Sequence, residues 1–138
     1  VFIQSFETAN LKYLRQRTSV KLIQLVDADD VNLDGSLAFN KPYDRPYDWT
    51  VSARNQLFKD LLTPQGLAEV KTYADGVGPW KRYLVSGKAT DANADGKAGD
   101  INGDGVVNEA DLKAVPETSI VKDAHAIGLL VHPYTFRN

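Results

Sequence analysis

The first 27 residues alternate between two kinds of apolar pattern, and this alternation limits the fold more than any other feature of the sequence. "VFIQSF" at residues 1–6 and "KLIQLVD" at residues 21–27 are short and rich in β-branched residues, which is typical of strands. Between them, "ETANLKYLRQR" carries Leu11 and Leu14 and a basic end, which predicts an amphipathic helix. A strand, a helix and a strand in so short a stretch predict a βαβ unit with parallel strands.

The middle of the chain continues the pattern after an interruption. Residues 28–50 are rich in Asp, Asn, Gly and Pro and show no periodicity, which predicts a long loop that is functional or inserted. "TPQGLAEVKTYADG" predicts a helix with Thr63 as its N-cap, Pro64 at its first position and Gly76 at its end. "GVGPWKRYLV" then predicts a short strand or turn.

The last third ends with one more helix and one more strand. "PETSIVKDAHAIG" at residues 116–128 predicts a helix that ends in a glycine, and "LLVHPYTFR" at residues 129–137 predicts a strand. Alternating strands and helices predict an α/β fold with a parallel sheet. A closed eight-stranded barrel uses roughly 30 residues per strand and helix. The sequence therefore predicts a partial TIM-type (β/α) barrel with about half of the strands, and two unpaired sheet edges.

Composition excludes several classes of protein. A chain of 138 residues is the size of one domain, and its net charge of −2, with 16 dispersed basic residues, does not favour nucleic acid as a partner. No apolar run is long enough to span a membrane, and the absence of cysteine excludes disulfides. The chain begins at Val1 and contains no methionine, from which we expect it to be a piece of a longer protein.

"DINGDGVVNEAD" at residues 100–111 has the composition and spacing of a calcium-binding loop. Such loops place oxygen ligands at positions 1, 3, 5, 7, 9 and 12 and a glycine at position 6. Here those ligand positions hold Asp100, Asn102, Asp104, Val106, Asn108 and Asp111, and Gly105 is at position 6. Aspartate at position 12 resembles the loops of dockerins, and "EADLKAV" predicts a helix that follows the loop.

Two other stretches begin with the same pattern. Asp91, Asn93 and Asp95 are followed by a glycine, but the twelfth position of this loop overlaps the loop that starts at Asp100. "DVNLDG", which starts at Asp30, reaches Lys41 at its twelfth position. Residues 91–111 contain six acidic residues and one lysine, and a bound cation would offset their mutual repulsion.

These observations predict an insert at residues 88–116 that binds Ca²⁺. The alternative is that runs of Asp, Asn and Gly are solvated turns.

Four motifs carry a resemblance to a known family. "VFIQSFETANLKYL", "KLIQLVD", "YADGVGPWK" and "GLLVHPYTFRN" occur in the order found in the C-terminal half of glycerophosphodiester phosphodiesterases, and the chain most resembles the bacterial periplasmic or secreted type. The resemblance covers nearly the whole chain except the insert and residues 28–55. It implies a TIM-type barrel that hydrolyses glycerophosphodiesters to glycerol 3-phosphate and an alcohol with a divalent cation, commonly Ca²⁺.

The same resemblance implies that the catalytic machinery lies elsewhere. The family's two catalytic histidines and its metal-binding carboxylates belong to motifs of the N-terminal half, and none of these motifs occurs here. We therefore expect no catalytic residue in this chain, His125 and His132 included. We expect the missing N-terminal half of the barrel to be its partner, and the chain alone to be inactive.

Residues after the strands are expected to form walls of the substrate pocket, because barrel sites assemble at the carboxyl ends of the strands. The residues we expect to contact substrate are Phe6, Trp80, Tyr134 and Arg137. Gln24 and Glu7 occupy similar positions, and Glu7 is also placed to cap the following helix.

Two alternatives stay open: a non-catalytic calcium-binding or docking module, and a half-barrel that pairs with a second copy. The family type and the need for abundant calcium predict a periplasmic or secreted location.

Overall fold

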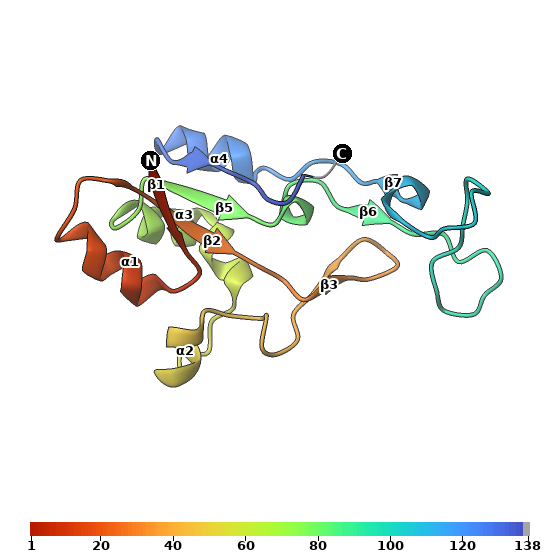
Figure 1. Cartoon of the computed structure of the whole chain (residues 1–138), viewed down its shortest axis with the longest axis horizontal. Helices are drawn as coiled ribbons and strands as arrows, with labels where there is room; N and C mark the ends of the chain where they lie inside the picture. The colour runs from red at the N-terminus through yellow and green to blue at the C-terminus, as the bar shows by residue number, and fades with distance from the viewer. Residues whose placement is uncertain (137–138) are drawn as a thin grey trace.

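The computed structural model describes residues 1–136, and its centre is a sheet of four parallel strands (Figure 1). The strands β1 (Phe2–Ser5), β2 (Lys21–Val26), β5 (Gly76–Pro79) and β8 (Leu130–Val131) lie side by side in that order. Each pair of neighbours is parallel, so every later strand adds to the same edge of the sheet. Strands of a (β/α) barrel are arranged in this way. The predicted α/β class with a parallel sheet is confirmed.

One face of the sheet is covered by helices. The connections between the strands contain α1 (Thr8–Arg15), α3 (Pro64–Lys71) and α4 (Ile120–Ala126). Their apolar side chains form a single core with alternate residues of the strands. The fully buried members of this core include Leu11, Leu22, Val26, Leu67, Val70, Val77 and Ala124. Because side chains alternate along a strand, Ile23 and Leu25 of β2 point to the other face.

The other face of the sheet is curved and only partly covered. The rings of Phe2 in β1 and His132 after β8 meet edge to face across it, with 4.7 Å between ring centroids. Gly76 of β5 allows β8 to pack closely beside it: a Cβ atom on Gly76 would lie 2.6 Å from the carbonyl oxygen of Leu130. Phe2, Phe6 and Leu130 remain between 39% and 46% exposed. This face is therefore an apolar concave surface open to solvent.

The segment predicted as a loop, residues 28–50, is more ordered than expected. It contains a β-hairpin of β3 (Asp30–Val31) and β4 (Leu37–Ala38), followed by α2 (Tyr47–Val51). Asp34 accepts hydrogen bonds from Ser36, and Gly35 adopts a φ of +88°, which closes the hairpin turn. The run starting at Asp30 is thus a hairpin turn, which explains why its sequence resembles only the beginning of a calcium loop.

The next helix begins as predicted and ends earlier. A 3-10 turn, η1 (Phe58–Leu62), precedes α3, and the Thr63 hydroxyl accepts a 3.1 Å hydrogen bond from the Gly66 N–H. The helix ends at Lys71, where the Thr72 hydroxyl donates back to a main-chain carbonyl. Gly76, predicted to end this helix, is instead the first residue of β5.

The final strand is also shorter than predicted. Within residues 129–136, β8 spans only Leu130–Val131, and one further bridge joins Trp80 to Tyr134. Pro79 of β5 lacks the N–H group that would donate to the carbonyl of His132, which separates the bridge from the strand.

Two short paired strands join the acidic insert to the rest of the protein. After η2 (Lys81–Tyr83), β6 (Gly87–Lys88) pairs antiparallel with β7 (Lys113–Ala114), and the loops between them extend away from α1 (Figure 1). The helix predicted after the calcium-like loop is not formed: the single 3-10 turn η3 (Glu109–Asp111) leads directly into β7. No helix in residues 1–136 is both long and apolar enough to cross a membrane.

The start of α1 is capped from a distant part of the chain. Glu7 at the N-cap position makes no capping hydrogen bond, which contradicts the role expected for it. Asp48 in α2 accepts hydrogen bonds from the Thr8 hydroxyl at 2.8 Å and from the Ala9 N–H at 2.7 Å. The indole of Trp49 donates to the same Thr8 hydroxyl. Helix α1 is therefore attached to α2 through its first turn.

We expect Asp48→Ala to lower the free energy of unfolding by about 1–2 kcal/mol, the usual cost of removing a capping side chain. Urea denaturation followed by far-UV circular dichroism measures the change. Glu7→Ala is the matched control and should change stability by less than about 0.5 kcal/mol. Equal losses in the two variants would show that Asp48 does not act as the cap.

Candidate functional site

The carboxyl ends of the four parallel strands meet along one edge of the sheet. In Figure 1 the arrows of β2 and β5 point toward the side of the molecule that carries β3, β6 and the insert. After β5 and β8 the main chains stay together, because the Lys81 N–H donates a 2.7 Å hydrogen bond to the Tyr134 carbonyl. Sites of parallel α/β folds form at this edge. It is therefore the candidate functional site.

Phe6 and Tyr134, expected to be walls of a pocket, are brought together at this edge. Their rings pack edge to face with 6.1 Å between centroids, and Phe6 also contacts the ring of Phe58. The Tyr134 hydroxyl donates a 3.0 Å hydrogen bond to the carbonyl of Val26, and burial of the phenol raises the pKa of Tyr134. We call this place the aromatic hollow. Its volume is about 200 Å³, and it is lined by Gln4, Phe6, Leu25, His132, Pro133 and Tyr134.

A second hollow lies on the other side of Tyr134, toward the insert. It has a volume of about 260 Å³ and is lined by Trp80, Lys81, Glu109 and Thr135. We call it the basic hollow. Trp80, a predicted wall residue, is partly buried here and packs against the core. The structure therefore places Trp80 beside a basic side chain, whereas Phe6 and Tyr134 line the apolar hollow next to it.

Three charged residues in and beside the basic hollow were not predicted from the sequence. Lys81 and Arg82 each form an ion pair with Glu109, at 2.7 Å and 2.9 Å. The hydrogen bond from Lys81 and the charge of Arg82 lower the pKa of Glu109. Two adjacent basic residues, Lys81 and Arg82, follow "GVGPW" in the sequence, and from them this basic pair could have been predicted. Nothing local in the sequence connects them to Glu109.

Other residues considered from the sequence take structural positions or lie apart. Gln24 is fully buried on the helix-covered face, where the Tyr73 hydroxyl donates to its side-chain oxygen. His125 is exposed on α4, and His132 lines the aromatic hollow beside Phe2. Arg137 lies outside the described residues.

The loop from Asp100 folds around its own main chain. The Asp100 carboxylate accepts hydrogen bonds from the Gly103 and Gly105 N–H groups, at 2.7 Å and 2.8 Å. Asp111 is 4% exposed and accepts from the N–H groups of Ile101, Asn102 and Asn108. These bonds lower the pKa of Asp111. Main-chain N–H groups therefore fix the side chains of Asp100 and Asp111 at the two ends of one closed turn.

The loop from Asp91 has a similar local structure. Asp91 accepts from the N–H group of Gly96, as Asp100 accepts from that of Gly105 in the other loop, and also from the N–H group of Asp95. Asn93 and Asp95 are linked side chain to side chain, as are Asn102 and Asp104. The two stretches are thus structural repeats of one turn.

The donor chemistry of these loops suits Ca²⁺, but their carboxylates do not converge. Carboxylate, amide and main-chain oxygens are the ligands that Ca²⁺ prefers. Asn102, Asp104, Val106 and Asn108 supply such oxygens between Asp100 and Asp111, in addition to the carboxylates at the two ends. Within residues 1–136, however, no three histidine or acidic side chains are gathered closely enough to hold a metal by themselves. The loop therefore offers the types of ligand that Ca²⁺ prefers, but its carboxylates are not close enough together to hold the ion by themselves.

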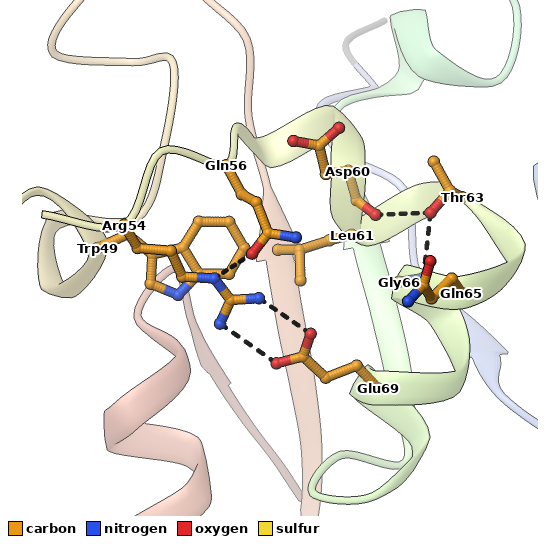
Figure 2. A pocket seen from close by; sticks show the side chains of 9 residues that line it. All are labelled: Trp49, Arg54, Gln56, Asp60, Leu61, Thr63, Gln65, Gly66 and Glu69. Carbon is orange, nitrogen blue, oxygen red and sulfur yellow. Dashed lines mark hydrogen bonds and ion pairs between the residues drawn. The ribbon is translucent and has the colours of Figure 1, made fainter. Parts of the chain in front are cut away.

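A third hollow lies on the helix side of the molecule and is a packing feature (Figure 2). Its volume is about 260 Å³, and α3 and the segment before it form its walls. Arg54 stacks on the Trp49 ring at 4.0 Å and donates both arms of its guanidinium group to Glu69. The hydrogen bond from Arg54 lowers the pKa of Glu69. The charges of Arg54 and Glu69 in this hollow thus satisfy one another.

Comparison with known proteins supports the family resemblance through a distantly related sequence. No protein-family model matches the chain. The glycerophosphodiester phosphodiesterase GDPD6 of Arabidopsis thaliana is 27% identical over 138 residues, which is 100% of this chain and 26% of that protein. The chain therefore spans about a quarter of the length of the curated relative. Over its whole length, it is similar to one part of a glycerophosphodiester phosphodiesterase.

Proposed function

We propose that this chain forms part of a glycerophosphodiester phosphodiesterase with a TIM-type barrel, which hydrolyses glycerophosphodiesters to glycerol 3-phosphate and an alcohol. The observation that carries the proposal is the similarity to such an enzyme along the entire chain. The parallel order β1-β2-β5-β8 supports it, because consecutive strands of a barrel pair in this way. The missing strands would then lie beyond β1 and β8.

The chain's own residues would form walls of the substrate pocket. Phe6 and Tyr134 form an apolar surface at the carboxyl edge of the sheet, suited to the glycerol or alcohol side of the substrate. Trp80 extends this wall toward the insert, and Arg137 is proposed to meet the phosphate through its planar guanidinium group. The acid and base that cleave the ester would come from the rest of the barrel. A divalent cation, when bound, would neutralise charge on the phosphoryl group.

Hydrolysis of glycerophosphocholine tests this proposal. The chain alone should release no glycerol 3-phosphate, whereas the full-length product of its gene should release it with Ca²⁺ present. In the full-length protein, Tyr134→Ala should reduce kcat/KM by about tenfold or more, the effect of losing a positioning contact. Tyr13→Ala, on an exposed face of α1, is the control and should leave kcat/KM unchanged. Turnover by the chain alone would contradict the claim that its catalytic groups lie elsewhere.

We further propose that the insert binds Ca²⁺ through the loop from Asp100 to Asp111, with the loop from Asp91 as a weaker copy. Support comes from the matching ligand types and from the carboxylates held at both ends of the turn. Loops of this kind in extracellular modules bind Ca²⁺ at about 10⁻⁴–10⁻³ M. Such affinity suits a periplasmic or secreted protein of the bacterial type, and we propose that location.

Calcium should therefore stabilise the chain measurably. At 10 mM Ca²⁺ a site with a Kd of about 10⁻⁴ M adds roughly 2.7 kcal/mol to the free energy of unfolding, which raises Tm by several degrees. Replacing Asp100 and Asp104 together with alanine should abolish the rise. The same change at Asp30 and Asp34, in the β3–β4 hairpin, is the matched control and should preserve it. A Tm that does not depend on Ca²⁺ in the unaltered chain would eliminate the calcium site.

A further inference from the structure

Two basic side chains at the carboxyl end of β5 hold a single carboxylate that arrives from the insert. We propose that Lys81 and Arg82 form an anion subsite for the phosphate group of a phosphate ester, and that Glu109 occupies this subsite as an internal competitor. The inference does not depend on the proposed function, because it requires only that this chain binds phosphate and not that it takes part in hydrolysis. Three observations support it: the geometry of the pair, the difference in exposure between its members, and the imbalance of charge.

The geometry is that of a bound oxyanion. The Lys81 ammonium donates to one carboxylate oxygen of Glu109 at 2.7 Å, and the Arg82 guanidinium contacts the other oxygen at 2.9 Å. Each oxygen thus has its own cationic donor. Two oxygens of a phosphate group present a similar pair of acceptors to an ammonium and a guanidinium group.

The two cations belong to the body of the protein, and the anion does not. The side chains of Lys81 and Arg82 are only 21% and 13% exposed, whereas that of Glu109 is 64% exposed. Lys81 is fixed through its main chain, whose N–H bonds to the carbonyl of Tyr134. Glu109 begins the one-turn η3 at the end of the long insert. Withdrawing Glu109 would therefore leave the cations in place.

The charges of the three paired side chains do not balance, because two cations are paired with one carboxylate. Lys81 and Glu109 line the basic hollow of about 260 Å³ with Trp80 and Thr135, and Arg82 reaches Glu109 from the adjoining hollow, which the exposed Asp30 also lines. A phosphate monoester with two negative charges would match both cations. A carboxylate tethered nearby acts as a competitor at an effective concentration of about millimolar order, which weakens the binding of free phosphate.

The location of Lys81 and Arg82 also favours a role in binding a ligand over a role that is limited to anchoring the insert. The subsite lies at the carboxyl edge of a parallel sheet, where ligands of this class of fold bind. It adjoins the aromatic hollow through Tyr134 and Thr135, which are consecutive in sequence and line the two hollows in turn. An ester bound across both hollows would place its phosphate on Lys81 and Arg82 and its organic part near Phe6 and Tyr134.

Phosphate titration followed by NMR tests the inference on the chain itself. The indole N–H of Trp80 reports on the subsite, and that of Trp49, which is buried and bonded to Thr8, is the internal reference. Glu109→Gln should bind inorganic phosphate and glycerol 3-phosphate about tenfold more tightly than the unaltered chain, with shifts at Trp80 and not at Trp49. Glu117→Gln removes the same charge from an exposed position and should bind as the unaltered chain does.

Further variants and a salt control separate phosphate binding at the two cations from a general effect of ionic strength. Replacing Lys81 and Arg82 with alanine in the Glu109→Gln background should abolish the binding, and sodium chloride at equal ionic strength should not reproduce the shift at Trp80. Glu109→Ala, with circular dichroism to verify folding, repeats the test without an amide in the hollow. Equal affinity in Glu109→Gln and the unaltered chain would overturn the subsite, even if the full-length protein hydrolyses glycerophosphocholine. Phosphate binding without hydrolysis by the full-length protein would preserve the subsite and reject the proposed function.

Discussion

Replacing Gly66 with alanine should destabilise the chain by at least about 3 kcal/mol. Alanine normally stabilises a helix relative to glycine by about 1 kcal/mol, so the expected sign is opposite to the intrinsic preference. The reason is contact with main chain: a Cβ atom on Gly66 would lie 1.9 Å from the carbonyl oxygen of Asp60 and 2.7 Å from two main-chain atoms of Leu61. Main-chain atoms cannot rotate away as a side chain can. Either η1 or α3 must move, which disturbs a packed core.

Urea denaturation measures the loss, and the neighbouring residue provides the control. Gln65→Ala changes an exposed position of the same helix and should alter the free energy of unfolding by less than about 0.5 kcal/mol. A loss of less than about 1 kcal/mol in Gly66→Ala would mean that η1 does not pack against α3 as described. Because Leu61 and Leu67 are core residues on either side of this contact, we expect the variant also to unfold less cooperatively.

Replacing Gln24 with leucine should cost about 3 kcal/mol, although the change makes the buried side chain apolar. The side-chain amide of Gln24 donates to the carbonyl of Phe6 at 2.9 Å, and its oxygen accepts from the Tyr73 hydroxyl at 3.0 Å. Leucine would fill similar space and remove the hydrogen bonds that Gln24 makes with the Tyr73 hydroxyl and with the carbonyls of Phe6 and Leu25. Each buried unpaired polar group costs about 1–3 kcal/mol. The loss should appear in thermal and urea denaturation alike.

Tyr73→Phe separates the two parts of this network. It removes only the hydroxyl, so it should cost about 1 kcal/mol and leave the bond to Phe6 intact. The double variant Gln24→Leu with Tyr73→Phe should then be less destabilised than the sum of the single variants, because the phenylalanine needs no partner. Strict additivity would show that the two side chains do not interact in the folded chain.

The position of Gln24 also connects the core to the candidate site. Its bond to Phe6 fixes the main chain where β1 ends, and the Phe6 ring forms a wall of the aromatic hollow. A residue first considered as a ligand-binding group is thus a structural support behind the wall. In Gln24→Leu we expect the aromatic ring signals of Phe6 and Tyr134 to broaden in NMR spectra, because the main chain just after β1 has lost its side-chain hydrogen bond to β2.

The tertiary structure reveals a contact of the insert that its sequence alone does not indicate. From the sequence it is a calcium-like loop placed between two elements of an α/β fold. In the structure its residue Glu109 reaches Lys81 and Arg82 beside Trp80. The insert therefore contacts the candidate site directly. The proposed binding of Ca²⁺ to its acidic loop and access to the basic hollow are separate properties, tested at Asp100 and Glu109 respectively.

The elements with strong local signals were predictable. β-branched runs at residues 2–5 and 21–26 form the first two parallel strands, and Thr63 with Pro64 starts α3. These features follow from the periodicity and main-chain preferences of a few neighbouring residues. The hairpin from Asp30 was missed because its turn residues are common to loops of several kinds.

The contacts that complete the molecule join residues far apart in the chain. Asp48 caps α1, Tyr73 bonds to Gln24, and Glu109 pairs with Lys81 and Arg82. The sequence by itself determined the α/β class, the strands and the ligand types of the acidic loops, because each depends on adjacent residues. Only the tertiary structure decided which face Gln24 occupies, which carboxylate caps α1 and which anion fills the basic hollow, because each of these requires two distant segments to be folded against one another.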